Sequence, residues 1–233
     1  MSGMERLGPF TYRQGGFPLG QDTLLLGRFA TLRRGGRVCD LGCGAGALPL
    51  LLLARESSLD LSGVELDGEA AALARRNLAE NGLSGVIRTG DLRRVREQFP
   101  AGCFDLVVSN PPYYDRSLLP PDAGRTTARH TVALTHGELI AAACRLLAPE
   151  GRLAVILPAV EAQRFREQAR GRLALRRLTE VWSTPRSGVK RCLMEFVRGD
   201  AAELRTDRLV IEEAPGRFTE EYRRLTGDFY LKF

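Results

Sequence analysis

Short apolar runs alternate with helix-patterned stretches from residue 38 onward, and this alternation limits the fold more than any other feature. The sequence predicts strands at 38–41, 59–66, 86–89, 104–109 and 152–157. It predicts helices at 47–55, 67–81, 138–147 and 161–170. Repeated strand–helix units favour a parallel sheet with helices on both faces. With two closing strands at 175–182 and 192–198, we expect an α/β fold with a doubly wound, seven-stranded, mostly parallel sheet.

The remaining segments are expected to complete one domain. The expected parts are an N-terminal extension at 1–37, a main domain at 38–200 and a C-terminal segment at 201–233. An apolar helix at 23–32 lets the extension pack beside the ligand site, and the C-terminal segment adds a strand at 209–211 and a helix at 219–225.

The chain lacks the patterns of a membrane or metal protein. No apolar run reaches the roughly 20 residues of a membrane span, and the first residues lack the apolar stretch of a signal peptide. The five cysteines form no C-x-x-C pair and are accompanied by only two histidines. We therefore expect a cytoplasmic protein with reduced, buried thiols, no membrane contact and no metal.

The positive charge has two explanations. The net charge is +6 and the pI is about 9.4, and only two of the 34 basic residues, Lys190 and Lys232, are lysines. Arginine makes bidentate contacts with phosphate, so a polyanionic partner is one explanation. A GC-rich genome that favours arginine codons is the other, and net charge alone does not decide between them.

A glycine-rich turn, D-x-G-x-G-x-G, joins the first strand of the alternation to its helix at 40–46. Such a turn lies at the carboxyl end of a parallel strand, where ligands bind. Gly42, Gly44 and Ala47 also match the dinucleotide pattern. However, Asp40 would oppose a pyrophosphate and attract an ammonium group. A tight turn with packing glycines is the alternative without a ligand.

Acidic residues follow the next two strands. Glu65 ends the second strand, where a carboxylate can accept hydrogen bonds from ribose hydroxyls of either a nicotinamide or a methionine cofactor. Asp91 follows the third strand and suits an N-cap of a short helix at 92–98. A ligand contact and a cap are compatible at Asp91.

The fourth strand runs directly into Asn110-Pro111-Pro112-Tyr113. Two prolines stiffen this backbone and lack N–H donors. The Asn110 amide oxygen and the Pro111 carbonyl can both accept hydrogen bonds from one planar NH₂ group, and Tyr113 can stack on the group that carries it. The motif therefore predicts a site for an exocyclic amine or a carboxamide. The aperiodic stretch 113–135 that follows has a length typical of functional loops.

The two motifs together carry a resemblance. The 40–46 turn resembles the first motif of class I S-adenosylmethionine-dependent methyltransferases, and residues 110–113 resemble the NPPY motif of enzymes that methylate adenine-N6, cytosine-N4 or protein glutamine-N5. The resemblance implies a Rossmann-like fold, S-adenosylmethionine as cofactor, and catalysis by Asn110, Pro111, Pro112 and Tyr113. It implies cofactor contacts from Gln21, Asp22, Asp40, Gly42, Cys43, Gly44, Gly46, Glu65, Leu66, Asp91, Leu92 and Asn110.

Other segments narrow the resemblance. Gln14, Asp22 with the leucines after it, and the stretches 128–136, 190–196 and 229–233 are similar to the bacterial tRNA (adenine-N6)-methyltransferases that act on valine tRNA. Gln21 departs from this pattern, which has threonine or a small residue there. The resemblance implies a tRNA partner and methylation of the adenine 3′ of the anticodon. It implies substrate contacts from Arg125, Arg129, His130, Lys190 and Arg191.

Two other functions remain open. A protein glutamine-N5 methyltransferase acting on release factor shares the NPPY motif, but its usual helical N-terminal domain does not fit into about 37 residues. A non-catalytic RNA-binding protein on a methyltransferase scaffold would not need an intact Asn110. Basic residues outnumber acidic ones in 1–37 and in 161–208, on both sides of the predicted crevice, which favours RNA.

Overall fold

The computed structural model describes residues 4–15, 19–111, 134–199 and 203–229. Its main sheet contains β3 (Arg37–Leu41), β4 (Asp60–Glu65), β5 (Val86–Thr89), β6 (Phe104–Ser109), β7 (Leu147–Pro158), β8 (Leu173–Trp182), β9 (Val189–Arg198) and β10 (Arg205–Val210). The strand order is β10-β8-β9-β7-β6-β3-β4-β5. Strand β9 is antiparallel to both β7 and β8, whereas the other neighbouring strands run parallel.

The predicted count of seven strands in this sheet is wrong by one. The C-terminal segment contributes β10 as an eighth strand, which pairs in parallel with β8 at the edge of the sheet. Only Leu209 of β10 is buried, so the strand carries no apolar run that would mark its full length. An edge strand needs few apolar residues, because one side of its ladder faces solvent.

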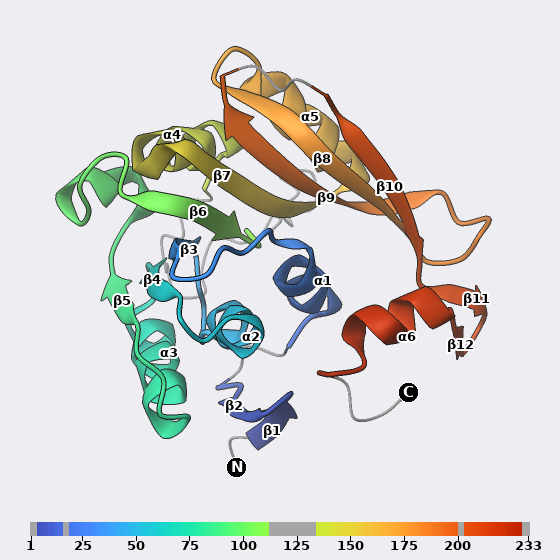
Figure 1. Cartoon of the computed structure of the whole chain (residues 1–233), viewed down its shortest axis with the longest axis horizontal. Coiled ribbons are helices and arrows are strands. Elements are labelled where there is room, and N and C mark those ends of the chain that lie inside the picture. The colour runs from blue at the N-terminus through green and yellow to red at the C-terminus, as the bar shows by residue number, and fades with distance from the viewer. Residues whose placement is uncertain (1–3, 16–18, 112–133, 200–202, 230–233) are drawn as a thin grey trace, which may run out of the picture.

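Helices cover both faces of the sheet (Figure 1). They are α1 (Gln21–Phe29), α2 (Ala47–Arg55), α3 (Gly68–Glu80), η1 (Leu92–Glu97), α4 (His136–Leu146), α5 (Ala159–Ala169) and α6 (Glu220–Thr226). The first three lie on one face of the sheet, and η1, α4 and α5 lie on the other. The doubly wound α/β prediction is confirmed, as are the predicted bounds of α2, β5 and β6.

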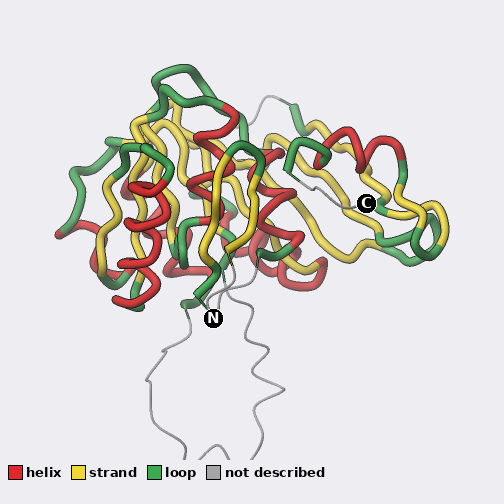
Figure 2. The backbone as a smooth tube through the Cα atoms, turned by 90° about the horizontal axis from the view of Figure 1, so that it is seen from below, coloured by secondary structure: helices red, strands yellow, loops and turns green. Residues whose placement is uncertain are grey.

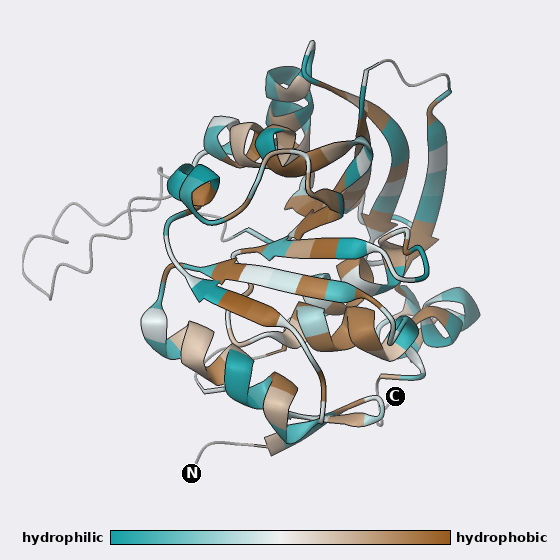
Figure 3. Cartoon of the chain, turned by 60° about the vertical axis from the view of Figure 1, so that its left-hand side comes forward, coloured by the Kyte–Doolittle hydropathy of each residue, from teal (hydrophilic) through white to brown (hydrophobic). Residues whose placement is uncertain are grey.

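Alternating strand residues divide the interior into two cores. Val38, Leu106 and Ile156 belong to the core under α1–α3, and their neighbours Cys39 and Val107 belong to the core under α4 and α5. Successive side chains of a strand point to opposite faces, so both faces of the central strands are apolar. Figure 3 shows brown, hydrophobic stretches within the strands of the sheet and mixed teal and brown residues along the helices.

Helix α1 ends earlier than its apolar pattern predicts, at Phe29 instead of residue 32. The chain turns extended at Ala30, and half-buried arginines from other elements satisfy the last carbonyls of the helix. Arg55 donates to the carbonyl oxygens of Gly27 and Ala30, and Arg177 donates to that of Phe29. These tertiary contacts decide where the helix ends, since unpaired terminal carbonyls need partners.

Two small hairpins are absent from the sequence prediction. Strands β1 (Met4–Leu7) and β2 (Phe10–Arg13) form one, and β11 (Glu212–Ala214) and β12 (Arg217–Phe218) form the other. The first hairpin crosses the outer side of α2 and α3 (Figure 2). Asn81, the C-cap of α3, accepts a hydrogen bond from Thr11 N and donates one to Thr11 O.

Local capping supports the helices that flank the site. The Asp67 side chain accepts hydrogen bonds from the N–H groups of Glu69 and Ala70, which confirms the predicted cap of α3. Thr135 and Glu138 form a capping box at the start of α4. None of the helices in the described part of the chain is long and apolar enough to cross a membrane.

Candidate active site

The motif residues meet at one edge of the sheet. Strands β3, β4, β5 and β6 are parallel, so their carboxyl ends lie side by side. In this register Asp40 lies opposite Gly63 and Val108, and Glu65 lies opposite Thr89. The carboxyl edge of the sheet, where the sequence predicts the ligand site, is therefore where the structure brings the glycine turn, Glu65 and Asn110 together.

The three glycines of the turn do two different things. All have positive φ, at 80° for Gly42, 52° for Gly44 and 86° for Gly46. A Cβ on Gly46 would lie 3.1 Å from Ala74, so this glycine lets α3 pack against the turn. Among the residues that the structure describes, a Cβ on Gly42 or Gly44 would meet no atom within 4 Å. The first two glycines thus border open space, and only the third fits the packing explanation.

Glu65 holds the turn in place. Its Oε2 accepts a hydrogen bond from Gly44 N at 2.8 Å, and its Oε1 accepts one from Asp67 N at 2.9 Å. Cys43 lies within the same turn, but its thiol is buried against Gly63. Glu65 therefore holds the shape of the glycine turn and also lies beside it.

Asp40 is a buried carboxyl group whose charge is poorly compensated. Only 1% of the residue is exposed, and its Oδ1 has no hydrogen-bond partner among the described residues. Burial, together with the nearby Glu65 carboxylate, raises the pKa of Asp40 well above the usual range. A cationic donor in the crevice would relieve both penalties, because it would pair the oxygen and oppose the negative charge.

Asn110 is fixed at the end of β6. Ser109 donates a buried hydrogen bond of 2.7 Å from its hydroxyl to Leu41 O, which ties the ends of β6 and β3 together. The Asn110 Nδ2 donates to Thr23 Oγ1 of α1 at 3.0 Å, and Pro111 is buried next to it. The other motif and loop residues of the prediction lie outside the described residues, namely Pro112, Tyr113, Arg125, Arg129 and His130.

Comparison with known proteins places this site in a family. The model of the methyltransferase small domain matches residues 20–166. A tRNA1(Val) (adenine(37)-N6)-methyltransferase of Serratia proteamaculans is 36% identical and covers 95% of this chain and 92% of its own length. Relatives with the same name in Porphyromonas gingivalis and Trichodesmium erythraeum are 40% and 34% identical, and cover 91% and 98% of this chain and 88% and 98% of their own lengths.

The chain belongs to the methyltransferase small-domain family. Solved structures of other proteins share the fold of this methyltransferase. A predicted O-methyltransferase of Agrobacterium tumefaciens superposes with a TM-score of 0.72 at 22% identity, covering 89% of this chain and 96% of its own. TrmN from Thermus thermophilus superposes with a TM-score of 0.57 at 22% identity, over 76% of this chain and 48% of its own. The protein is thus a class I, S-adenosylmethionine-dependent methyltransferase.

The residues at the crevice suit S-adenosylmethionine. Its amino-acid part carries an ammonium group, which is the kind of donor that the buried Asp40 Oδ1 lacks. The open space beside Gly42 and Gly44 lets a ligand approach the backbone closely. Leu66 leaves 48% of its surface exposed beside Glu65, an apolar surface of the kind that a purine ring can cover.

Asp91 of the methyltransferase acts as a cap, as its sequence position predicts. Its side chain accepts a hydrogen bond from Arg93 N at 2.9 Å and pairs with the Arg93 guanidinium through both oxygens. The Arg93 hydrogen bond is the largest cause of its lowered pKa, so Asp91 is ionised at neutral pH. Neighbouring Leu92 is buried at the start of η1.

The start of α1 is fastened to distant parts of the methyltransferase. Gln21 Nε2 donates to the hydroxyl of the buried Tyr222 in α6 at 2.9 Å, and Asp22 forms an ion pair of 2.8 Å with Arg191 of β9. Two predicted cofactor residues and one predicted substrate residue therefore make contacts within the protein. Lys190, beside Arg191, is exposed.

Asn77 is a site residue that sequence reasoning missed. It is fully buried in α3, where Nδ2 donates to Ala45 O in the glycine turn at 2.8 Å and to Arg13 O at 3.1 Å. Its Oδ1 accepts a hydrogen bond from Arg13 N at 3.0 Å. The signal in the sequence is an amide on the apolar face of an alanine-rich helix, where a buried polar group needs partners.

Proposed function

We propose that this methyltransferase transfers a methyl group to N6 of an adenine in tRNA, and that the target is the adenine 3′ of the anticodon in valine tRNA. The observation that carries the proposal is the Asn110–Pro111 acceptor pair at the end of β6, in a chain that matches enzymes named for this reaction over 91% or more of its length. The named position in those relatives is adenine 37.

The proposed chemistry depends on how the amine is held. The lone pair of an aryl amine is delocalised into the ring, which makes the nitrogen a poor nucleophile. Asn110 Oδ1 and the Pro111 carbonyl would accept hydrogen bonds from the two N–H groups of the amine. These bonds would favour a more tetrahedral nitrogen, with its lone pair directed at the methyl group. Holding both reactants in one geometry supplies much of the rate. The proton can leave after transfer, so no strong base is required beforehand.

The cofactor-binding residues are assigned by chemistry. When bound, S-adenosylmethionine supplies an electrophilic methyl group on a sulfonium. We propose that its ammonium group contacts Asp40 and that its ribose hydroxyls contact Glu65. The cofactor would approach the backbone closely at Gly42 and Gly44. The Glu65 carboxylate has about four acceptor positions and uses two for backbone N–H groups. The backbone of Cys43 and Gly46, and the side chains of Gln21, Asp22, Leu66, Asp91 and Leu92, complete the proposed surroundings.

The remaining assignments concern the substrate. Tyr113 would stack on an adenine that has been splayed out of the anticodon loop, as enzymes that modify a base require. Arg125, Arg129, His130, Lys190 and Arg191 are proposed contacts to RNA. We propose that 1–37 and 201–233 complete the main domain at 38–200, and that the protein acts on tRNA in the cytoplasm.

Product analysis tests the proposal. The purified protein is incubated with labelled S-adenosylmethionine and either tRNA from a strain that lacks the modification or release factor. We expect N6-methyladenosine in the tRNA and no label in the protein. Methylglutamine in release factor without N6-methyladenosine would favour the glutamine-N5 reaction instead, and tRNA binding without any transfer would favour a non-catalytic RNA-binding role.

The control variant is Asn110→Ala. It should abolish transfer while the affinity for S-adenosylmethionine, measured by calorimetry, stays within about twofold, because Asn110 would act mainly on the acceptor amine. Full activity in Asn110→Ala would contradict the assigned mechanism.

A further inference from the structure

We propose that Thr23 is a positioning residue that orients the Asn110 amide for the acceptor amine. The hydroxyl of Thr23 accepts a hydrogen bond from Asn110 Nδ2 at 3.0 Å, between residues 87 apart in the sequence. This inference rests on the proposed function, since the amine is the group for which the amide is oriented.

The backbone of Asn110 is already constrained. The Ser109–Leu41 hydrogen bond fixes the residue before it, and the proline after it restricts its φ and ψ to extended values. The side-chain torsions of Asn110 are the freedom that remains. An amide that turned by half a rotation about its last torsion would present NH₂, a donor, to a substrate amine that is also a donor.

In this structure the Thr23 hydroxyl accepts from Nδ2 and so holds that edge of the amide against α1. Since the amide is planar and Nδ2 is directed at α1, Oδ1 lies on the other branch, away from Thr23. The acceptor that the proposed mechanism needs is then in place before the substrate arrives. Groups that are oriented in advance stabilise a transition state without reorganisation during the reaction.

Thr23 is itself held rigidly. The two residues before it in α1 are fastened by the Gln21–Tyr222 hydrogen bond and the Asp22–Arg191 ion pair. The residues after it, Leu24 to Leu26, are fully buried. The geometry of the acceptor therefore depends on a line of contacts that begins in α6 and β9 and reaches Asn110 through the first turn of α1.

Three variants of the full chain test the inference. Thr23→Val keeps the shape of the side chain and removes the hydroxyl, Thr23→Ser keeps the hydroxyl, and Thr31→Val makes the same change just beyond the other end of α1. Thr31 is a suitable control because its hydroxyl accepts a hydrogen bond from Arg177 and does not contact Asn110.

We expect Thr23→Val to lower kcat about tenfold, the equivalent of one hydrogen bond, with little change in the KM for tRNA or in cofactor affinity. Thr23→Ser should recover most of the rate. Thr31→Val should lower Tm without lowering kcat. A Thr23→Val enzyme with normal kcat, or a Thr23→Ser enzyme as slow as Thr23→Val, would overturn the inference.

A spectroscopic readout separates this inference from the proposed function. The side-chain NH₂ signals of Asn110 can be assigned by their loss in Asn110→Ala, and they should shift in Thr23→Val but not in Thr31→Val. Unshifted signals in Thr23→Val would refute the orienting contact for any substrate. Shifted signals in a protein that makes no N6-methyladenosine would support the contact and refute the proposed function.

Discussion

Some residues at this site carry a charge that the fold makes unfavourable, and Asp40 is the main example. Its raised pKa means that the folded protein holds the Asp40 proton more tightly than the unfolded chain does. Without cofactor, stability should therefore fall as the pH rises from the ordinary carboxyl range through the raised pKa. A bound ammonium group should remove this loss, so stabilisation by the cofactor should grow with pH over the same window.

The variant Asp40→Asn tests this electrostatic role. It removes a buried charge, so the cofactor-free variant should melt at a higher temperature than wild type, by about 2–4 °C for each kcal/mol recovered in a chain of this size. It should bind S-adenosylmethionine about 10- to 100-fold more weakly, because a charged hydrogen bond is lost. Thermal melts with and without cofactor across pH check both effects. Unchanged affinity in Asp40→Asn would contradict the assigned ammonium contact.

The open glycines of the turn can be tested against a matched control. Gly44 and Gly82 both have positive φ, and a Cβ on either would meet no atom of the described residues within 4 Å. Gly44→Ala and Gly82→Ala should each cost about 1–2 kcal/mol of stability from backbone strain. Only Gly44→Ala should also weaken cofactor binding. Equal cofactor affinity in the two variants, measured by calorimetry, would show that the space beside Gly44 is not the cofactor site.

At this scale the sequence predicts residues that act within a motif and misses those that act across the fold. Asp40 and Asn110 are recognisable because Asp40 lies next to the end of a strand, Asn110 directly follows one, and each belongs to a spaced pattern. Thr23 and Tyr222 have no such pattern. Their importance comes from contacts with residues 87 and 201 positions away, which only the packed structure brings together.

Whole elements were predicted where their pattern is strong and local. The bounds of α2, β5 and β6 follow from apolar periodicity and adjacent turn residues, and α3 follows from its Asp67 cap. The end of α1 and the full length of β10 could not be predicted in this way. Half-buried arginines contact the end of the former, and backbone pairing with β8 forms the latter.

Helix α3 connects the N-terminal hairpin to the glycine turn, and Asn77 within it and Asn81 at its C-cap allow a controlled test. Asn77→Ala would leave buried groups of Arg13 and Ala45 unpaired and should cost about 2–4 kcal/mol. It should also weaken cofactor binding, since the Ala45 carbonyl belongs to the turn. Chemical denaturation and calorimetry measure the two effects.

The matched control is Asn81→Ala, which removes three hydrogen bonds to Thr11 of the same hairpin, and one to Asn77 O, at a half-exposed position. Water can replace these bonds, so the expected cost is about 1 kcal/mol or less, with unchanged cofactor affinity. Equal losses of stability and affinity in the two variants would refute the special role of Asn77.

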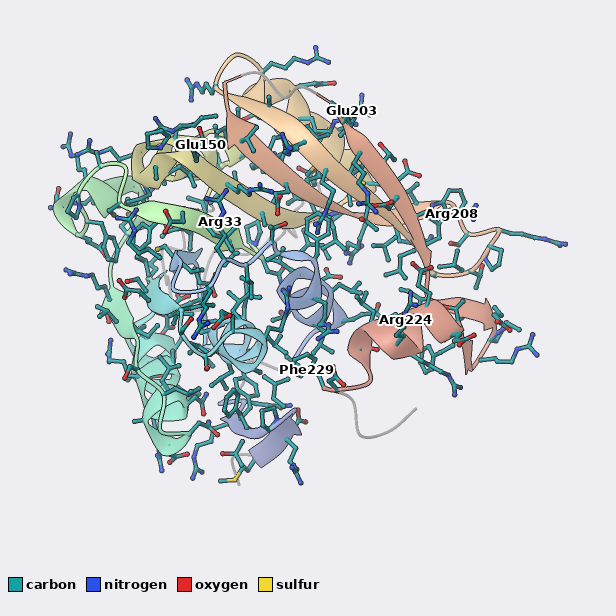
Figure 4. All side chains as sticks on the ribbon, viewed as in Figure 1. Arg33, Glu150, Glu203, Arg208, Arg224 and Phe229 are labelled. Carbon is teal, nitrogen blue, oxygen red and sulfur yellow. The ribbon has the colours of Figure 1, made fainter. Side chains whose placement is uncertain are left out.

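For the whole molecule, the net charge alone does not indicate where RNA would bind. Charged side chains surround the molecule, and the labelled Arg33, Arg208 and Arg224 lie in the loop before β3, in β10 and in α6 (Figure 4). Other arginines serve the fold, as Arg55 and Arg177 do at the end of α1, and Arg191 is paired with Asp22. Binding of RNA should therefore depend on particular basic residues at the carboxyl edge of the sheet.

Salt dependence tests this distribution of charge. Lys190 is exposed next to Arg191, where β9 begins at the carboxyl edge, whereas Arg33 is exposed before the amino end of β3. Lys190→Ala should reduce the slope of log affinity for tRNA against log salt by about one, and Arg33→Ala should leave it unchanged. Equal slopes for Lys190→Ala and wild type would exclude Lys190 as a phosphate contact.

The most direct test of the central claim is to map the methyl group in valine tRNA after the reaction. Nuclease fragments analysed by mass spectrometry identify the modified nucleotide, and nucleoside analysis identifies the nitrogen. The wild-type protein should add one methyl group to N6 of the adenine 3′ of the anticodon, and Asn110→Ala should add none although it binds the cofactor. A methyl group on a ring nitrogen, or at another nucleotide, would contradict the claim.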